Sequence, residues 1–427
     1  MHIEFAFGKS GLRLALPDTF DYQVLEARAA RSLPDPAHAL AHALAHPVSS
    51  PPLRELARGK QSAAISVCDI TRPAPNRQTL PPVLATLEAA GIPRDGIRIM
   101  IATGLHRAAT DAEIREIVGP EIAATYAVLN HDARNLDEHR YLGATRRGTP
   151  AYIDRRFMDA DLHITLGFIE PHLMLGFSGG RKLIVPGLAA QETIKVIHSP
   201  RFMREPHAIE GVIEQNPLHH ELCEIAGMAR HDFMLDVALA RDRAIAGVFA
   251  GHAQEAHRHG VQFVSDTLLE PLDEPVDAVI TSAAGYPLDL TFYQAIKGVT
   301  AAHHILKPGG KILLMAECRE GPGAPEFQHM LKTFGSYPHF LDSIRVTPVV
   351  VDQWQLEKLA LIATKFDVLF YVPGLPASFR EHFGANMFDT PEAALAALEA
   401  ALPHNARVAV IPEGPYVLAR VTGELAA

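Results

Sequence analysis

Three stretches of the chain combine titratable side chains with glycine or proline in patterns that suit a ligand site. The densest is EPHLMLGFSGGRKLIVPG, residues 170–187, which follows an apolar run and holds a histidine, several glycines and the pair Arg181 and Lys182. Glycine permits positive φ and a close approach of backbone to ligand, and the two cations would attract an anion. This stretch predicts a ligand loop.

Two shorter stretches also follow apolar runs. In DITRPAPNR, residues 69–77, the prolines stiffen the loop, and the planar fork of Arg72 could grip a carboxylate through two hydrogen bonds. Asp69 is placed to hold Arg72 in one orientation, although an Asp–Arg pair that only closes the loop is the structural alternative. In ATGLHR, residues 102–107, His106 stands beside a flexible glycine.

Histidines supply the remaining candidate chemistry. His106 and His172 follow two strands of one predicted sheet, so they can face each other across a crevice, one accepting a proton while the other donates it. The helical pattern QETIKVIHS, residues 191–199, brings His198 towards the same loop, where a helix-end cap is the alternative. A further row, His38, His42 and His46, lies on one helical face but has no acidic or cysteine partner for a metal.

These residues need a scaffold, and short apolar runs alternating with helical patterns predict βα units around mostly parallel, Rossmann-like sheets. Strands are expected at 63–69, 97–104, 126–132, 162–169, 233–240, 276–283, 310–316, 367–374 and 406–414. Helices are expected at 37–46, 78–91, 110–118, 291–305, 353–364 and 391–401. The proline-marked segment 268–277 predicts two α/β domains, 1–270 and 271–427, with an interdomain active-site cleft.

Composition excludes several classes of protein. The chain has 427 residues, 48% of them apolar, and a formal charge of -10, which argues against a nucleic-acid surface. Cys68, Cys223 and Cys318 form no C-x-x-C pair, which fits a reducing cytosol. Residues 1–18 favour a β-hairpin and lack the apolar core of a signal peptide, and no run of eighteen apolar residues occurs. We therefore expect a soluble, cytoplasmic protein.

Three familiar motifs are only partly matched. GFSGGRKL lacks the spacing and the hydroxyl residue of a phosphate-binding P-loop. HILKPGGKILL, residues 304–314, is similar to a turn of adenosylmethionine-dependent methyltransferases, but no glycine-rich loop follows the strand at 276–282. GFSGG has no strand immediately before it, as the nucleophile elbow of a hydrolase requires.

Taken together, DITRPAP, ATGLHR, EPHLMLGFSGGRKLIVPG, His198 and LDLTFYQAIKG (288–298) resemble the lactate racemase family of nickel-pincer nucleotide enzymes, in the same order along the chain. The resemblance spans roughly residues 1–420. It implies a cofactor, the pyridinium-3,5-bisthiocarboxylic acid mononucleotide with nickel, covalently bound through Lys182. It also implies that His198 is the metal ligand and that cofactor-synthesis enzymes are maturation partners. Gly179, Gly180 and Arg181 match neighbours of that cofactor.

The resemblance further implies a racemase or epimerase of a 2-hydroxy acid that works by reversible hydride transfer. His106 and His172 match the two acid/base residues, one for each enantiomer. The substrate-binding positions fall on Arg72 as carboxylate clamp, Asp69 as its supporting partner, and Gln294 and Lys297 from the second domain. Closure of the domains would then keep water from the oxo intermediate.

The sequence leaves the substrate and the oligomeric state open. Tyr293 and Trp354 are candidates for lining the pocket around the substrate's side group. Arg77 and Arg107 either pair a second carboxylate or are solvated. A non-catalytic protein that binds or carries the nucleotide cofactor is the alternative function, and a methyltransferase, suggested by the KPGGK turn, is a third.

Overall fold

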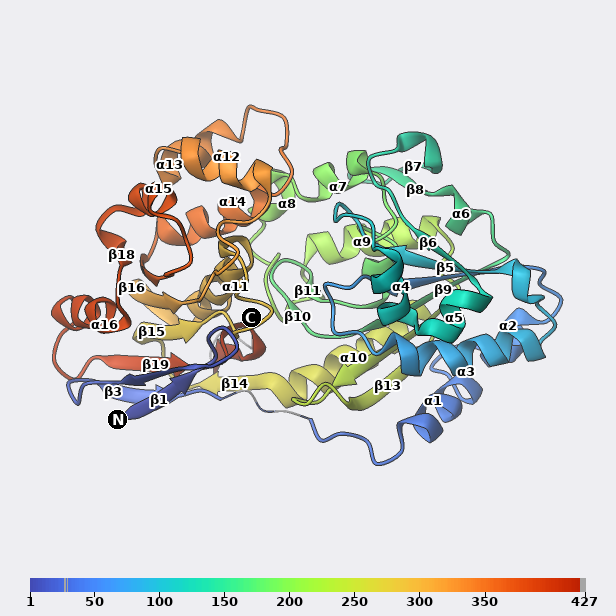
Figure 1. The fold of residues 1–427 in the computed structure, drawn as a ribbon, viewed down its shortest axis with the longest axis horizontal. Coiled ribbons are helices and arrows are strands. Elements are labelled where there is room, and N and C mark those ends of the chain that lie inside the picture. The colour runs from blue at the N-terminus through green and yellow to red at the C-terminus, as the bar shows by residue number, and fades with distance from the viewer. Residues whose placement is uncertain (27, 29, 423–427) are drawn as a thin grey trace. The chain divides into compact units, whose positions relative to one another are not determined.

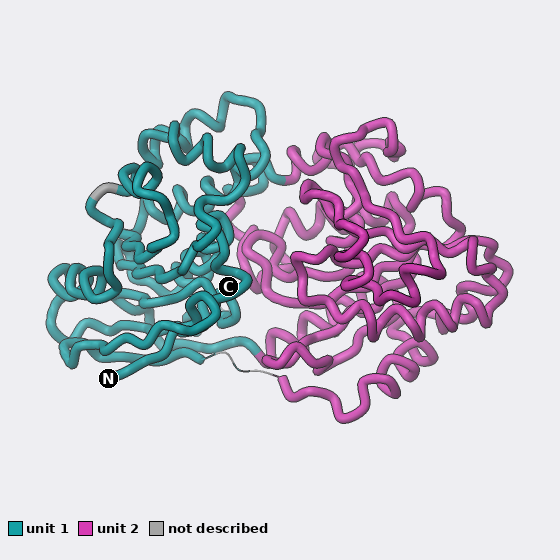
Figure 2. The backbone as a smooth tube through the Cα atoms, viewed as in Figure 1, with its two compact units in different colours: residues 1–28, 198–204, 268–427 teal, residues 29–197, 205–267 magenta. Residues whose placement is uncertain are grey.

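The computed structural model describes residues 1–26, 28 and 30–422, and the chain divides into two compact units (Figure 2). Unit 1 comprises 1–28, 198–204 and 268–427, and unit 2 comprises 29–197 and 205–267. The change of unit near 268 falls at the predicted linker. The segments 1–28 and 198–204 are grouped with the C-terminal residues, whereas the sequence assigned them to a domain 1–270.

Unit 2 is built on a sheet of order β13-β12-β9-β4-β5-β6, in which all neighbours are parallel except β12 and β13 (Figure 1). Its strands are β4 (Ala63–Cys68), β5 (Ile97–Ala102), β6 (Ala127–Asn130), β9 (Leu162–Phe168), β12 (Phe233–Leu239) and β13 (Ile245–Gly251). Every residue of β4 and β9 is buried. Central parallel strands are covered on both faces, which explains their continuous apolar runs.

Helices cover both faces of this sheet, and α1, α2 and α3 pack their apolar residues against it in one core. The helices are α1 (Pro36–Ala45), α2 (Leu53–Ala57), α3 (Asn76–Ala89), α4 (Asp111–Val118), α5 (Pro120–Thr125), α6 (Arg155–Met158), α7 (Gln191–Ile197), α9 (Pro217–Met228) and α10 (Ala253–Leu268). A capping box begins α4, in which the side chains of Thr110 and Glu113 each accept a hydrogen bond from the other residue's backbone N–H. A hairpin, β7 (His139–Ala144) with β8 (Pro150–Asp154), was not predicted.

Unit 1 has a second sheet of order β18-β17-β16-β15-β19-β3, parallel throughout. Its strands are β3 (Asp21–Val24), β15 (Val276–Ser282), β16 (Leu306–Met315), β17 (Asp367–Tyr371), β18 (Met387–Phe388) and β19 (Arg407–Ile411). β3 adds to the edge of β19, which is why the N-terminal residues belong to this unit. The KPGGK turn, considered as a methyltransferase feature, lies inside β16, where the register with β15 shifts.

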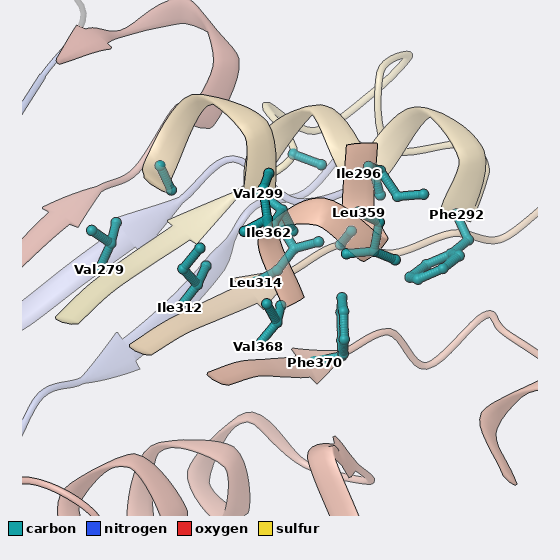
Figure 3. Packing of buried hydrophobic residues seen from close by; sticks show 14 of the residues in the cluster. Val279, Phe292, Ile296, Val299, Ile312, Leu314, Leu359, Ile362, Val368 and Phe370 are labelled. Atoms are coloured by element: carbon teal, nitrogen blue, oxygen red, sulfur yellow. The ribbon is translucent and has the colours of Figure 1, made fainter. Parts of the chain in front are cut away.

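The core of unit 1 lies between its sheet and the helices α11 and α14. Figure 3 shows Val299 of α11 near Leu314 of β16, and Phe292 of α11 beside Phe370 of β17. The helices of this unit are α8 (Pro200–Met203), α11 (Phe292–Ala302), α12 (Pro325–Thr333), α13 (Tyr337–Ser343), α14 (Gln353–Ala363), α15 (Ala377–Arg380) and α16 (Pro391–Ala400). A second apolar cluster covers the other face, where the hairpin β1 (His2–Phe5) with β2 (Leu12–Ala15) packs. β14 (Leu269–Leu272) pairs with β20 (Leu418–Val421).

The predicted α/β fold class with mostly parallel, Rossmann-like sheets is therefore confirmed. Each predicted strand and helix is present, with ends that differ by a few residues. None of the helices in the described part of the chain is long and apolar enough to cross a membrane.

The core of unit 1 can be tested through the only tryptophan of the chain, Trp354, which is buried on α14 in the same unit. We expect Leu314→Ala to lower the free energy of unfolding of unit 1 by roughly 2–5 kcal/mol, because it leaves a cavity under α11. Urea unfolding followed by tryptophan fluorescence measures this loss. Val346→Ala is the control, because Val346 is 86% exposed and should change stability by less than about 0.5 kcal/mol. Equal losses in both variants would contradict the described core.

Candidate active site

Three loops of unit 2 begin at the same edge of its sheet. Because β9, β4 and β5 are parallel neighbours, the loops that follow them all start at adjacent carboxyl ends. The hydroxyl of Ser66 on β4 donates to the carbonyl of Leu183 over 2.7 Å, and the N–H of Gly104 donates to the carbonyl of Gly187 over 3.0 Å. These bonds tie the 170–187 loop to both neighbours, so the three predicted ligand motifs are brought together.

The buried carboxylate of Asp69 holds the ring of His106. Asp69 Oδ2 and His106 Nδ1 lie 2.6 Å apart, and Asp69 Oδ1 accepts from the hydroxyl of Thr71 over 2.6 Å. Burial raises the pKa of Asp69, but the hydrogen bonds of His106 and Thr71 and the charge of Arg72 outweigh burial and lower it below its ordinary value. The charged carboxylate fixes the ring, and Nε2 is left as the nitrogen that can exchange a proton with a ligand.

Arg72 forms an ion pair with Glu170 at the start of the 170–187 loop. Its guanidinium Nη1 lies 4.0 Å from Oε1 of Glu170, while the carboxylate of Asp69 is engaged by His106 and Thr71. The Thr71 N–H also donates to Asp69 Oδ1 in an Asx-type bond. The predicted support of Arg72 by the Asp69 side chain stays a prediction. Arg72 and Glu170 are each 29% exposed, so the guanidinium keeps access to a ligand.

His172 lies on a short hairpin, β10 (Pro171–His172) paired with β11 (Gly176–Phe177). Ser178 closes this hairpin, because its N–H donates to the carbonyl of Glu170 over 2.8 Å and its hydroxyl accepts the Glu170 N–H over 3.0 Å. The same hydroxyl donates to the carbonyl of Phe168. The expectation that no strand stands directly before Ser178 was wrong, because β11 ends at Phe177, but this strand is only two residues long. His172 is partly exposed, and its predicted pairing with His106 stays a prediction.

A buried carboxylate that the sequence did not reveal supports the glycine turn. Gly179 has a φ of 85°, and a Cβ there would come within 2.2 Å of Asp236 Oδ2 on β12. The N–H of Gly180 donates to the same oxygen over 2.6 Å. Burial raises the pKa of Asp236 to about 7, against the opposing effects of the Gly180 hydrogen bond and the charge of Arg181. Both glycines are therefore required by the turn itself, and their predicted cofactor contact stays a prediction.

Arg181 points into the protein, where its side chain is 4% exposed. Its guanidinium lies 2.7 Å from the ring of His257 and donates to backbone carbonyls of Leu175, Phe177, Ser178 and Gly179. Burial and the charge of Arg181 hold the pKa of His257 well below its ordinary value. The guanidinium thus stabilises the loop from inside, and its predicted contact with a cofactor stays a prediction.

Lys182 differs from its neighbours in exposure, because it is partly exposed while Arg181 and Leu183 are buried. Burial raises the pKa of Cys68 to about 12, and the charges of Arg72 and Lys182 act against that rise. Both cations are therefore close enough to the end of β4 to act on its last residue. The single accessible amine in this buried stretch lies where an anionic ligand would also meet Arg72.

Three further candidates belong to unit 1. Gln294 and Lys297 are three residues apart on α11 and share one helix face, and both are partly exposed. His198 packs against Trp354 with 4.4 Å between the ring centroids. The predicted substrate contacts of Gln294 and Lys297 and the predicted metal contact of His198 stay predictions.

The two arginines considered for a second carboxylate have partners in the protein. Arg77 donates to the carbonyls of Arg115 and Glu116 at the end of α4. Arg107 forms a bidentate pair with Glu113, with N–O distances of 2.5 and 2.7 Å. Both guanidinium groups therefore have structural roles, which weakens the idea that they recognise a dicarboxylic substrate.

The histidine row on α1 brings its rings into contact, tilted between His38 and His42 and stacked between His42 and His46. The ring centroids of His38 and His42 lie 6.3 Å apart, and those of His42 and His46 lie 4.6 Å apart. Within the described ranges, no group of three or more His, Cys, Asp or Glu side chains is arranged to hold a metal ion.

The fold and the site define a two-unit α/β protein with a basic glycine loop and a carboxylate–histidine pair at one sheet edge. Family models match accordingly: the lactate racemase N-terminal domain over residues 7–211 and the lactate racemase C-terminal domain over residues 272–419. The chain is 34% identical over 428 residues to the lactate racemase of Thermoanaerobacterium thermosaccharolyticum, covering 98% of this chain and 99% of that protein. It is also 34% identical over 376 residues to that of Lactiplantibacillus plantarum, covering 87% of this chain and 88% of that protein.

Solved structures agree with these matches. The lactate racemase apoprotein of T. thermosaccharolyticum superposes with a TM-score of 0.92 at 32% identity, over 98% of this chain and all of that one. A protein from Thermotoga maritima has a TM-score of 0.65 at 17% identity, over 87% of this chain and 97% of that one, and shares the fold. The chain belongs to the lactate racemase family, as its motifs indicated, and is an isomerase of the racemase class.

The raised pKa of the Asp236 carboxyl predicts that the stability of the fold depends on pH. Its folded pKa of about 7 lies above the ordinary value near 4, so between these pH values the folded chain holds a proton that the unfolded chain has released. Its contribution to stability therefore falls as the pH rises through this window. We expect Asp236→Asn to gain stability relative to the unmodified chain between pH 5 and pH 8, by on the order of 2 kcal/mol. Urea unfolding followed by circular dichroism, with hydrogen exchange of β12, measures the gain.

Asp232 is the matched control, because it precedes the same strand but its pKa is lowered. Burial raises the pKa of Asp232, and the hydrogen bonds of His163 more than offset burial. Both its folded and unfolded forms are charged above pH 5, so Asp232→Asn should show no such pH dependence. A flat difference for Asp236→Asn over the same range would contradict a raised pKa.

Proposed function

We propose that the chain interconverts the enantiomers of a 2-hydroxy acid, lactate or a larger relative of it, with a nickel-pincer nucleotide bound covalently through Lys182. The observation that carries this proposal is the grouping of the Asp69–His106 pair with Arg72 and Lys182 at one sheet edge. Membership of the lactate racemase family and the substrate named for both relatives support it.

The residues present fit such a cofactor. Lys182 offers a partly exposed amine on a turn that Arg181 and Asp236 hold from inside, and an amine can form a covalent bond with an acid arm of the nucleotide. His198 offers an imidazole, a donor that suits nickel alongside sulfur and carbon from the cofactor. When bound, this cofactor supplies the acceptor that takes hydride from the substrate Cα and returns it.

The remaining steps belong to side chains of the chain. Arg72 binds the substrate carboxylate through its guanidinium fork. Nε2 of His106 takes the hydroxyl proton as hydride leaves Cα, and the Asp69 carboxylate stabilises the imidazolium that forms. Inversion requires an acid/base group on each face of the planar oxo acid, and we assign the second of these groups to His172. Gln294 and Lys297 of unit 1 complete the proposed substrate contacts.

The alternative is a protein that carries the nucleotide without catalysis. The short bond between Asp69 and His106 favours an enzyme, because a buried carboxylate that orients a half-exposed imidazole is the arrangement that proton transfer needs. Carriage of an anionic nucleotide would need only the basic loop.

The tether predicts a specific chemical defect. Lys182→Ala, produced together with cofactor-synthesis enzymes, should lack a covalent adduct and lose lactate racemisation completely, because no other group replaces the amine. Intact mass, a peptide map and a chiral lactate assay measure both effects. Lys60→Ala is the control, because Lys60 precedes β4 at the opposite end of the strand. Adduct retention in Lys182→Ala would sink the tether assignment.

The histidines predict a separate defect. His106→Gln and His172→Gln should each lower kcat/KM for racemisation by about 10²–10⁴, the usual contribution of one general acid or base. The double variant should still carry the adduct, since neither residue holds it. His38→Gln on α1 is the control and should behave like the unmodified chain. Normal turnover in the double variant would overturn the acid/base assignment. An unmodified chain that binds the ligand but does not turn it over would favour the carrier function.

A further inference from the structure

The segment 198–204 leaves one unit and enters the other. It lies between residues of unit 2 on both sides, yet it belongs to unit 1. Its helix α8 buries Phe202 and Met203 almost completely, at 0% and 1% exposure. The segment is therefore packed into unit 1 and is more than a linker.

An ion pair fixes the carboxyl end of this segment. Arg204 Nε donates to Glu357 Oε1 on α14 over 2.7 Å, and Arg204 Nη2 donates to the carbonyl of Leu341 on α13 over 2.6 Å. The Glu357 side chain is fully buried. Burial raises its pKa, whereas Arg204 lowers it through a hydrogen bond and its charge. Removing Arg204 would leave the Glu357 carboxylate buried without its cation, which strongly destabilises a folded protein. The ion pair therefore holds the end of the segment in a defined position.

The amino end of the segment meets the same face of α14. His198 packs against the ring of Trp354, whose indole N–H donates to the hydroxyl of Tyr293 over 3.0 Å. Trp354 and Glu357 are three residues apart on α14 and therefore lie on one helix face. One turn of α14 thus holds both ends of a seven-residue segment.

We infer that Arg204 is a positioning residue for His198, acting with Glu357 to hold the imidazole on unit 1. This inference rests on the proposed function, in which His198 is the nickel ligand and Lys182, in unit 2, is the tether. The covalent tether and the metal ligand are then different residues, and Arg204 acts only on the second. Loss of the Arg204–Glu357 pair releases the Arg204 end of the segment. This loss weakens the contact of His198 with nickel and leaves the covalent bond at Lys182 unchanged.

The test separates these two attachments. Arg204→Met, His198→Ala, the double variant and the unmodified chain are produced with cofactor-synthesis enzymes. Intact mass gives the fraction of chains with the Lys182 adduct, and elemental analysis gives nickel per adduct. We expect equal adduct fractions, a fall of threefold or more in nickel per adduct for Arg204→Met and for His198→Ala, and no further fall in the double variant.

Two additional variants guard against a general loss of structure. Lys307→Met breaks an ion pair with Asp277 in the same unit and should keep nickel per adduct unchanged. Glu357→Gln keeps the shape and an acceptor oxygen for Arg204 while removing the charge, so it should give a smaller fall than Arg204→Met. If Arg204→Met does not fold, nickel per adduct is compared between Glu357→Gln and Lys307→Met. A lower value in Glu357→Gln supports the inference, and equal values contradict it.

Three results would overturn the inference. The first is nickel per adduct in Arg204→Met equal to that of the unmodified chain while His198→Ala loses nickel. The second is an additive loss in the double variant, which means that Arg204 does not act through His198. The third is an unmodified chain without any adduct on Lys182, which removes the proposed function itself and is recognised by mass alone.

Discussion

The buried guanidinium of Arg181 is the interaction on which the candidate site depends. A cation is costly to bury, and here the cost is offset by hydrogen bonds to several backbone carbonyls of one loop, between Leu175 and Gly179. Those carbonyls must turn inward to reach it, which gives the loop its course. Lys182 follows as the next residue and, unlike Arg181, is partly exposed.

Two carboxylates near this loop have opposite electrostatic states. Asp69 has several hydrogen-bond and charge partners, which lower its pKa despite burial, so it stays charged and holds His106. Asp236 lies in the same sheet with fewer compensating partners, and burial raises its pKa to about 7 while it holds the glycine turn. The two environments therefore leave Asp69 charged beside His106 and make Asp236 the partner of the glycine turn.

The course of the chain between the units separates residues that are close in sequence. Lys182 and His198 are sixteen residues apart, yet the first belongs to unit 2 and the second to unit 1. The packing of Phe202 and the Arg204–Glu357 pair explain this assignment.

The sequence by itself determined the scaffold and the family. The parallel strands were predictable because buried central strands require continuous apolar runs, and the capping box of α4 because it is a local pattern. The glycine loop and His106 were found for the same reason, since strand ends mark ligand sites in such sheets. Only the tertiary structure decided which groups these side chains contact. Asp69 hydrogen-bonds His106, Arg72 forms an ion pair with Glu170, and Arg181 donates to backbone carbonyls. Those contacts join residues distant in sequence, and their choice depends on burial and hydrogen-bond geometry that no spacing along the chain records.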